Sequence, residues 1–292
     1  MAEADPWAPG KFDRDTAVTL QARDGARCSF SAEVSPDWRA GRGPHGGYLA
    51  AMLLRALTLA VDEEERSPRS LTIHYASAPE PGPVRIETVI ERSGRSLSTL
   101  SARLEQGGAL KALVLSAFSV PWSGPEISSL PMPEVEPPAP GRRAGTIIEE
   151  GGPPFARLIT LQPRFGGMPF SGAEQPLETG GWLGLAEARP IDPLSLAFFA
   201  DALIPVPFFK LPEPNPAPTI DLTVHFRGGL PPLAERDPEE LCLARVRGGL
   251  IREGFFEEDT VMWSPDGRVL AHSRQLALLL PMRMAAAPAP GA

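Results

Sequence analysis

The stretches Leu71-Thr-Ile-His-Tyr75 and Leu222-Thr-Val-His-Phe226 are near copies of one another in the two halves of the chain. Both alternate apolar and polar residues and are rich in β-branched side chains, which predicts a strand in each half (the echo strands). Turns rich in Gly or Pro follow, and then further strand-like runs over 84–92, 97–104, 106–118, 241–246, 254–263 and 265–277. We infer that one structural unit occurs twice.

An apolar helix is predicted before each echo strand, over about 47–61 and about 193–203. Asp192 is the candidate N-cap of the second helix, because an Asp side chain can accept from the free N–H groups of a first turn. Both helices are apolar nearly all round, so each should be buried on most sides. A curved antiparallel sheet of about five strands would cover such a helix.

The composition is that of a globular protein, and it excludes several classes of function. The 292 residues carry a formal net charge of −8 and show no basic patch, so we expect no nucleic-acid partner. The longest apolar stretch, 48–61, is too short to span a bilayer, and the first residues lack the pattern of a secretory signal. Cys28 and Cys242 lie far apart and suit a reducing compartment. We therefore expect a cytoplasmic protein with no membrane partner.

Three kinds of site common in enzymes are not supported by the sequence. Gly41-Arg-Gly-Pro-His-Gly46 fits the spacing G-x-G-x-x-G, but no apolar strand precedes it and Pro44 lies within it. No G-x-S-x-G occurs, which argues against an α/β-hydrolase. The four histidines have no metal-ligand spacing with Cys or carboxylates. We expect no metal and no cofactor.

Five motifs carry a resemblance to a known family. They are Gly43-Pro-His-Gly-Gly-Tyr48, Ala200-Asp-Ala202, Pro218-Thr-Ile-Asp221, Gly254-Phe-Phe-Glu-Glu-Asp259 and Ser273-Arg-Gln-Leu-Ala-Leu-Leu279. In this order within the repeat they resemble the acyl-CoA thioesterase II (TesB-like) family of the thioesterase-like superfamily. The resemblance covers most of residues 20–281. It implies an α+β double hot dog fold, two repeats of an antiparallel sheet wrapped around a buried helix.

The resemblance and the composition together predict four segments. An N-terminal hot dog is expected over 1–125 and a C-terminal hot dog over 155–282. Between them, 126–154 is dense in Pro and Gly and is expected to be a linker. Residues 283–292 are expected to be a disordered tail.

The resemblance implies that an Asp, a Thr or Ser, and a Gln of the second half form one active site, and the matching positions are Asp201, Thr219 and Gln275. Asp201 is expected on the second helix, where a carboxylate among apolar residues is costly unless it is hydrogen-bonded. Thr219 and Gln275 can orient Asp201 and a water, so that Asp201 acts as general base. The alternative is that Asp201 is a solvent-exposed helix residue, Thr219 an ordinary strand residue and Gln275 a surface strand residue.

The known members continue the Thr-Ile-Asp motif with a His and later a Trp, whereas this chain has Leu222 and His225. We therefore expect the chemistry to be kept and the acyl specificity to differ.

Gly46 and Gly47 are candidate substrate-binding residues, because backbone N–H groups at a helix N-terminus can hold an oxyanion. His45 and Tyr48 beside them complete the candidate substrate-binding set, with a purely structural role at the helix entry as the alternative for His45. The acyl pocket is expected between the two helices, with lining candidates Met52, Phe198, Phe199, Phe208 and Phe209.

The expected function is hydrolysis of an acyl thioester to a carboxylic acid and CoA by an Asp-activated water. The expected partners are acyl-CoA or an acyl-carrier thioester, and further copies of the chain in a homo-oligomer. Two alternatives on the same fold stay open: a hydratase or dehydratase on acyl thioesters, and a non-catalytic acyl- or lipid-binding protein. By position only, Arg55, Arg92, Arg95 and Arg227 are candidates for contacts with CoA.

Overall fold

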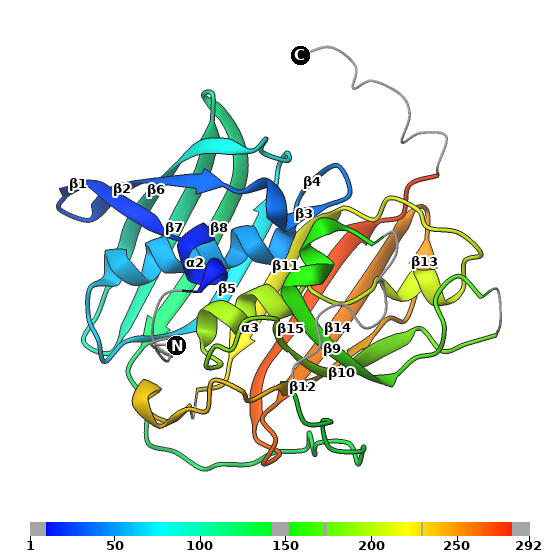
Figure 1. Cartoon of the computed structure of the whole chain (residues 1–292). Coiled ribbons are helices and arrows are strands. Elements are labelled where there is room, and N and C mark those ends of the chain that lie inside the picture. Colours follow the sequence, from blue (N-terminus) through cyan, green and yellow to red (C-terminus); the bar gives the residue numbers. More distant parts are fainter. Residues whose placement is uncertain (1–9, 142–151, 172–173, 229, 282–292) are drawn as a thin grey trace, which may run out of the picture.

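Two helix-containing halves share one continuous antiparallel sheet in this computed structural model, which describes residues 10–141, 152–171, 174–228 and 230–281 (Figure 1). The described sheet has 13 strands in the order β1-β2-β6-β7-β8-β5-β11-β15-β14-β12-β10-β9, with β13 paired to β14. The α+β double hot dog prediction is confirmed. Each half contributes six strands to the main path, one more than the expected five.

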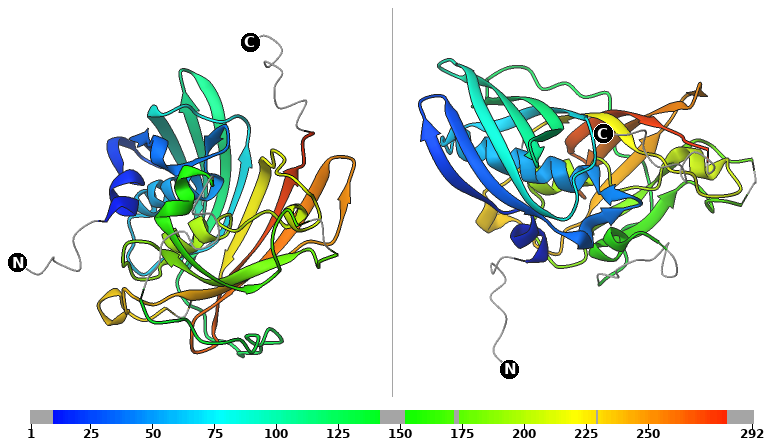
Figure 2. Two further views of the ribbon diagram at one scale, coloured as in Figure 1. Left: turned by 45° about the vertical axis from the view of Figure 1, so that its right-hand side comes forward. Right: turned by 90° about the horizontal axis from the view of Figure 1, so that it is seen from above.

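The N-terminal half wraps α2 in strands that come before and after it in the chain. Its elements are α1 (Lys11–Asp15), β1 (Val18–Asp24), β2 (Arg27–Val34), a 3-10 turn η1 (Pro36–Trp38), β3 (Arg39–Ala40), β4 (Gly43–Pro44), α2 (Gly46–Val61), β5 (Ser67–Tyr75), β6 (Gly82–Ser93), β7 (Leu97–Gln106) and β8 (Ala109–Ser119). Figure 2 shows α2 running along the concave side of this sheet. Most α2 side chains are buried there, as its uniformly apolar sequence predicts.

The C-terminal half repeats the plan with a shorter helix. Its elements are η2 (Pro154–Leu158), β9 (Ile159–Phe165), β10 (Glu178–Leu185), α3 (Pro193–Phe199), η3 (Val206–Phe209), β11 (Thr219–Phe226), η4 (Leu233–Glu235), β12 (Cys242–Arg247), β13 (Ile251–Arg252), β14 (Phe255–Trp263) and β15 (Val269–Leu278). None of the helices in the described part of the chain is long and apolar enough to cross a bilayer.

The two echo strands pair with each other, and this pairing joins the halves. In β5 and β11, Thr72 lies opposite Thr223, and the two hydroxyls are 3.1 Å apart. Leu71 and Leu222 on the other face are fully buried in the shared core. Thr72 and Thr223 are equivalent residues of the two repeats and lie opposite each other in antiparallel strands. A local pseudo-two-fold axis therefore passes between them and relates the two halves.

The helix α3 ends four residues earlier than predicted. Asp192 caps its N-terminus in a capping box with Ser195, as predicted. At the end of the helix the N–H groups of Asp201 and Ala202 donate to carbonyls three residues earlier instead of four, as in a turn. Pro205 also disfavours the helical conformation of the residue before it. The prediction that Asp201 lies on the helix is therefore wrong, because Asp201 lies in the turn that follows it.

Residues 120–141 have no regular element, and residues 130–139 among them contact the C-terminal half. The indole N–H groups of Trp182 and Trp263 donate to the carbonyls of Glu136 and Leu130 at 2.8 and 3.1 Å. Met132 packs on the same cluster. Residues 142–151 of the predicted linker and the predicted tail 283–292 lie outside the described residues. The expected segment boundaries stay a prediction.

Candidate active site

The Asp201 carboxylate lies where the two halves meet, held on both oxygens. Its Oδ2 accepts from the Gly47 N–H of α2 at 3.0 Å, and its Oδ1 accepts from the Thr219 hydroxyl of β11 at 3.2 Å. The side chain is 11% exposed. A carboxylate fixed by two donors, with lone pairs left for water, has the geometry that a general base needs.

A β-bulge turns Thr219 toward Asp201. The pairing of β11 with β15 shifts register between Thr219 and Asp221, so Thr219 lies opposite the buried Ala277. Strict alternation from the inward-facing Leu222 would place Thr219 on the outer face. The extra residue in the bulge re-aims the side chain inward. The bulge is therefore what brings Thr219 into the site.

Gln275 projects from the inner face of β15 and completes the group of three. Its side-chain oxygen lies 3.5 Å from the Thr219 hydroxyl, and the residue is 8% exposed. Its amide nitrogen donates to a carboxyl oxygen of Glu258 on β14. The structure thus brings Asp201, Thr219 and Gln275 together and adds Glu258 as a fourth polar residue.

The N-terminus of α2 closes against the end of α3 and leaves no room for side chains. A Cβ on Gly47 would lie 2.3 Å from the Phe198 carbonyl oxygen, and a Cβ on Gly46 would lie 2.7 Å from Asp201 Oδ2. The hydroxyl of Tyr75, at the end of β5, donates to the Gly46 carbonyl at 2.9 Å. Because the Gly47 N–H already binds Asp201, it orients the carboxylate instead of facing a substrate.

His45 links the two halves in a neutral form. Its Nδ1 accepts from the Tyr48 N–H at 3.3 Å, so Nε2 carries the proton and donates to the Asp201 carbonyl at 2.8 Å. Burial lowers the pKa of His45, although the charge and the carbonyl of Asp201 act to raise it. His45 therefore holds the backbone of Asp201 in place. The structural alternative considered for it fits better than contact with substrate.

Tyr48 packs in the N-terminal core. Its side chain is fully buried and stacks on Trp38 with the ring planes 2° apart. Its hydroxyl donates to the Asp15 carbonyl at 2.7 Å, with the Glu33 carbonyl as a second acceptor for the same hydrogen at 3.1 Å. This packing turns the side chain away from Asp201 into the N-terminal core, which argues against the predicted contact of Tyr48 with substrate.

The expected acyl pocket between the helices is filled by core side chains. Met52, Phe198, Phe199 and Phe209 are at most 2% exposed. The close approach of Gly47 to Phe198 explains this, since the two helices meet without a gap at that point. Phe208 is half-buried and packs on Phe170 with the ring centroids 5.0 Å apart.

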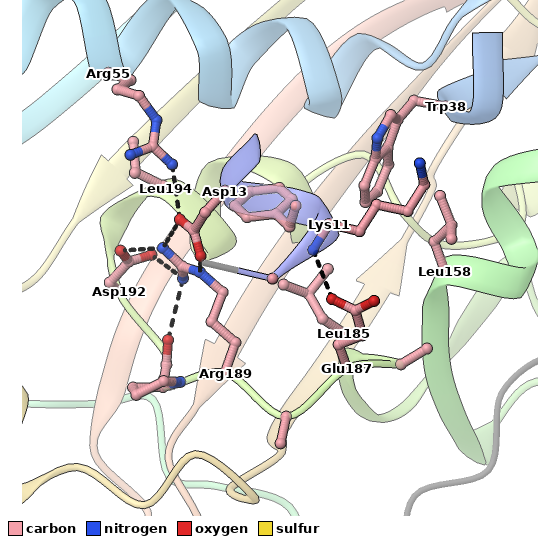
Figure 3. A pocket seen from close by; sticks show the side chains of 15 residues that line it. Lys11, Asp13, Trp38, Arg55, Leu158, Leu185, Glu187, Arg189, Asp192 and Leu194 are labelled. Carbon is pink, nitrogen blue, oxygen red and sulfur yellow. Dashed lines mark hydrogen bonds and ion pairs between the residues drawn. The ribbon is translucent and has the colours of Figure 1, made fainter. Parts of the chain in front are cut away.

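A cavity of about 320 Å³ lies elsewhere, between α1, α2 and the segment from β10 to α3 (Figure 3). Arg189 lies in its wall and pairs with Asp13 and Asp192, both at 2.8 Å. Arg55, a candidate CoA contact, is also paired with Asp13 at 2.8 Å. Asp201, Thr219 and Gln275 are not among its lining residues. The cavity is therefore separate from the site around Asp201, and Asp13 and Asp192 neutralise the arginines in its wall.

Both halves of the chain match descriptions of one protein family. Residues 34–120 match the "Acyl-CoA thioesterase N-terminal domain", and residues 131–279 match the "Acyl-CoA thioesterase C-terminal domain". The chain belongs to the acyl-CoA thioesterase family. Its two matched regions together contain His45, Gly46, Gly47, Asp201, Thr219 and Gln275.

Other proteins are similar to this acyl-CoA thioesterase family member over nearly its whole length. The uncharacterized protein Rv0499 of Mycobacterium tuberculosis is 27% identical and covers 86% of this chain and 90% of its own. A hot dog protein of unknown function from Alicyclobacillus acidocaldarius has a TM-score of 0.79 and 26% identity, covering 92% of this chain and 98% of its own. Acyl-CoA thioesterase II TesB2 from Mycobacterium marinum, at 16% identity and a TM-score of 0.67, shares the fold over 90% of this chain and 96% of its own.

Two residues near the site of this thioesterase-family chain were missed by the sequence analysis. Glu258 occupies an inward position of β14, where its neighbours at alternate positions are Phe256 and Thr260. A Glu on the core face of a predicted strand is the signal that could have found it. Tyr75 is the second missed residue, and its equivalent in the other echo strand is Phe226. The hydroxyl by which the two differ is the group that contacts Gly46, so this difference between the repeats is the signal that could have found it.

Replacing Gly46 by alanine should lower activity with little effect on stability. The new methyl group would lie 2.7 Å from Asp201 Oδ2 and 3.2 Å from the Tyr75 ring, so the carboxylate must move. A displacement of about 1 Å at a reacting group costs about 10²-fold in rate. On the hypothesis that Asp201 is the base for acyl-CoA hydrolysis, we expect kcat to fall by that order while the melting temperature changes little. Wild-type kcat in Gly46→Ala would show that Asp201 does not have to keep this position. Gly124→Ala, at a glycine without a positive φ and with nothing within 4 Å of the added Cβ, is a suitable control.

Proposed function

We propose that the protein hydrolyses acyl-CoA thioesters, with Asp201 as the general base. The observation that carries this proposal is the pinned, partly exposed Asp201 carboxylate, held by the Gly47 N–H and the Thr219 hydroxyl beside Gln275. A base held in one orientation can take a proton from water as the water attacks a carbonyl carbon. The family to which the chain belongs supports the thioester as the electrophile.

In the proposed reaction the water oxygen bonds to the thioester carbonyl carbon while Asp201 takes one water proton. The tetrahedral intermediate then collapses, the C–S bond breaks, and the proton goes from Asp201 to the leaving sulfur. The products are a carboxylic acid and free CoA, and Asp201 returns to its starting state. Thr219 and Gln275 hold the water and the carboxylate in line for the first step.

The test is release of free thiol from a panel of acyl-CoAs of short, medium and long chain and with aromatic acyl groups. We expect turnover of some members of the panel and a preference that reports the acyl specificity. Thermal melting with each acyl-CoA supplies a second measurement, since a ligand that binds the folded state raises the melting temperature. A ligand-dependent shift without any thiol release would contradict hydrolysis and favour the non-catalytic acyl-binding alternative.

The choice between CoA and a carrier protein belongs to the same test, with acyl-pantetheine as a substrate that lacks the nucleotide. Equal turnover of acyl-pantetheine and acyl-CoA would show that the nucleotide is not recognised. The cytoplasmic location and the homo-oligomeric state expected from the sequence stay predictions.

A further inference from the structure

Glu258 is a buried carboxyl group in direct contact with the proposed site. It is 5% exposed and lies on the inner face of β14, beside Gln275 on β15. One carboxyl oxygen accepts from the Val206 N–H at 2.7 Å, and the other contacts the Gln275 amide nitrogen. Both of these partners are neutral. A carboxyl group buried with neutral partners is costly to keep ionised.

The surroundings allow both protonation states of Glu258 near neutral pH. Burial and, to a smaller extent, the negative charge of Asp201 raise its pKa to about 7, against the hydrogen bonds from Val206 and Gln275. Its strand neighbours Glu257 and Asp259 face the other way, toward the Gly249 and Leu250 N–H groups and toward Arg274 respectively. The remaining titratable groups at the site, His45 and Tyr75, contact Asp201 and Gly46 on the α2 side.

The hydrogen atoms available at Thr219 and Gln275 distinguish the two states. The Thr219 hydroxyl has one hydrogen but faces two acceptors, Asp201 Oδ1 at 3.2 Å and Gln275 Oε1 at 3.5 Å. With Glu258 ionised, the Gln275 N–H must point to Glu258, and its oxygen then competes with Asp201 for that hydrogen. With Glu258 protonated, the amide can turn over, accept from Glu258 and donate to Thr219. In this second arrangement the Thr219 hydrogen has one acceptor, Asp201, and each contact from Glu258 through Gln275 and Thr219 to Asp201 joins one donor to one acceptor.

We propose that Glu258 is a positioning residue whose proton sets which way round the Gln275 amide lies. The protonated form supports the row Glu258 to Gln275 to Thr219 to Asp201, in which each group donates to the next. The second N–H of Gln275 then faces the site, where it can donate to the oxygen that becomes negative in the tetrahedral intermediate. In the ionised form Gln275 presents its oxygen instead. This inference rests on the proposed hydrolysis and assigns it a regulating proton.

The test compares the pH profile of wild type with that of Glu258→Gln. Glutamine keeps an oxygen for the Val206 N–H and offers an N–H to Gln275, so it imitates the protonated form at every pH. For wild type we expect kcat to fall by about tenfold per pH unit well above neutrality. For Glu258→Gln we expect near wild-type kcat at pH 6 and loss of that alkaline decline. Glu257→Gln, the same change on the outer face of β14, should keep the wild-type profile.

Two results would overturn the proposal. One is an alkaline decline in Glu258→Gln equal to that of wild type, which would mean that another group causes it. The other is a folded Glu258→Gln variant that is inactive at every pH, which would mean that the ionised form is the working one.

A measurement without substrate separates this proposal from the proposed function. The ¹⁵N side-chain signal of Gln275, assigned by its loss in Gln275→Leu, should shift with pH near neutrality in wild type and stay constant in Glu258→Gln. A constant signal in wild type would refute the role of Glu258 even if acyl-CoAs are hydrolysed. If no acyl-CoA is hydrolysed, the same titration still decides whether Glu258 turns the amide.

Discussion

Replacement of Asp201 by asparagine should lower kcat for acyl-CoA hydrolysis by about 10²–10⁴-fold, the range typical for loss of a general base. Asparagine has nearly the same shape, so its oxygen can accept from the Gly47 N–H and its amide group can face Thr219. The fold and the binding of substrate should therefore persist, while no group remains to take the water proton. KM should change much less than kcat, because the lost interaction acts in the transition state.

The matched control is Asp221→Asn, which makes the same chemical change on the same strand as Thr219. Asp221 pairs with His74 on the outer face of the sheet and does not contact Asp201. Thiol release under identical conditions, with melting curves of both variants, separates lost chemistry from lost folding. Turnover of Asp201→Asn within about tenfold of wild type, with the fold intact, would rule out the assigned base.

Replacement of Arg189 by methionine is expected to have the largest effect on stability. The Arg189 side chain is 13% exposed, and it pairs with Asp13 of α1 and with Asp192, the N-cap of α3. Removing it leaves two largely buried carboxylates without that charge, which typically costs about 3–5 kcal/mol. Arg189 also lies over the Phe12 ring at 5.0 Å from its centroid, so packing is lost as well. The free energy of unfolding from denaturant titration at pH 7 measures the effect.

The pH dependence of this stabilisation has a definite sign. Burial by itself would raise the pKa of Asp13, but the hydrogen bonds and charges of Arg189 and Arg55 hold it below the usual value. The contribution is therefore fully present above the unfolded-state pKa, about 3.9, and is lost as the pH falls through the lower pKa of the folded state. Arg274→Met, which breaks an exposed pair with Asp259, should cost less than about 1 kcal/mol. A similar small cost for Arg189→Met would contradict the structural role.

The repeat and its elements could be predicted because periodicity survives in the sequence. The echo strands and the strands 84–92, 97–104 and 254–263 all appear in the structure within a few residues of their expected bounds. The strand β10 (Glu178–Leu185) was missed because Gly180 and Gly181 interrupt its apolar pattern. Both glycines are required there, since a Cβ at either would lie 2.1 Å from a carbonyl oxygen of a neighbouring strand.

The predicted site was incomplete because strand register and side-chain direction cannot be read from a sequence pattern. The triad positions Asp201, Thr219 and Gln275 came from the resemblance, and the structure brings their side chains together. A bulge cannot be seen in the sequence of one strand, so the inward turn of Thr219 needed the register with β15. The position of Tyr48 next to Gly47 in the sequence does not show the direction of its side chain, which packs on Trp38.

The pairing of β5 with β11 makes this chain a fused dimer of related units, and fusion allows the two units to differ. Two identical subunits would carry every substitution twice, on both sides of their axis. Here Gly47 and His45 come from one unit and Asp201, Thr219 and Gln275 from the other, so the two contribute different parts to a shared centre. Tyr75 carries a hydroxyl where its counterpart Phe226 is buried in the core. Among the described residues, one unit therefore supplies the helix terminus and the other supplies the three side chains that meet it, so the two units together form a single group of this kind.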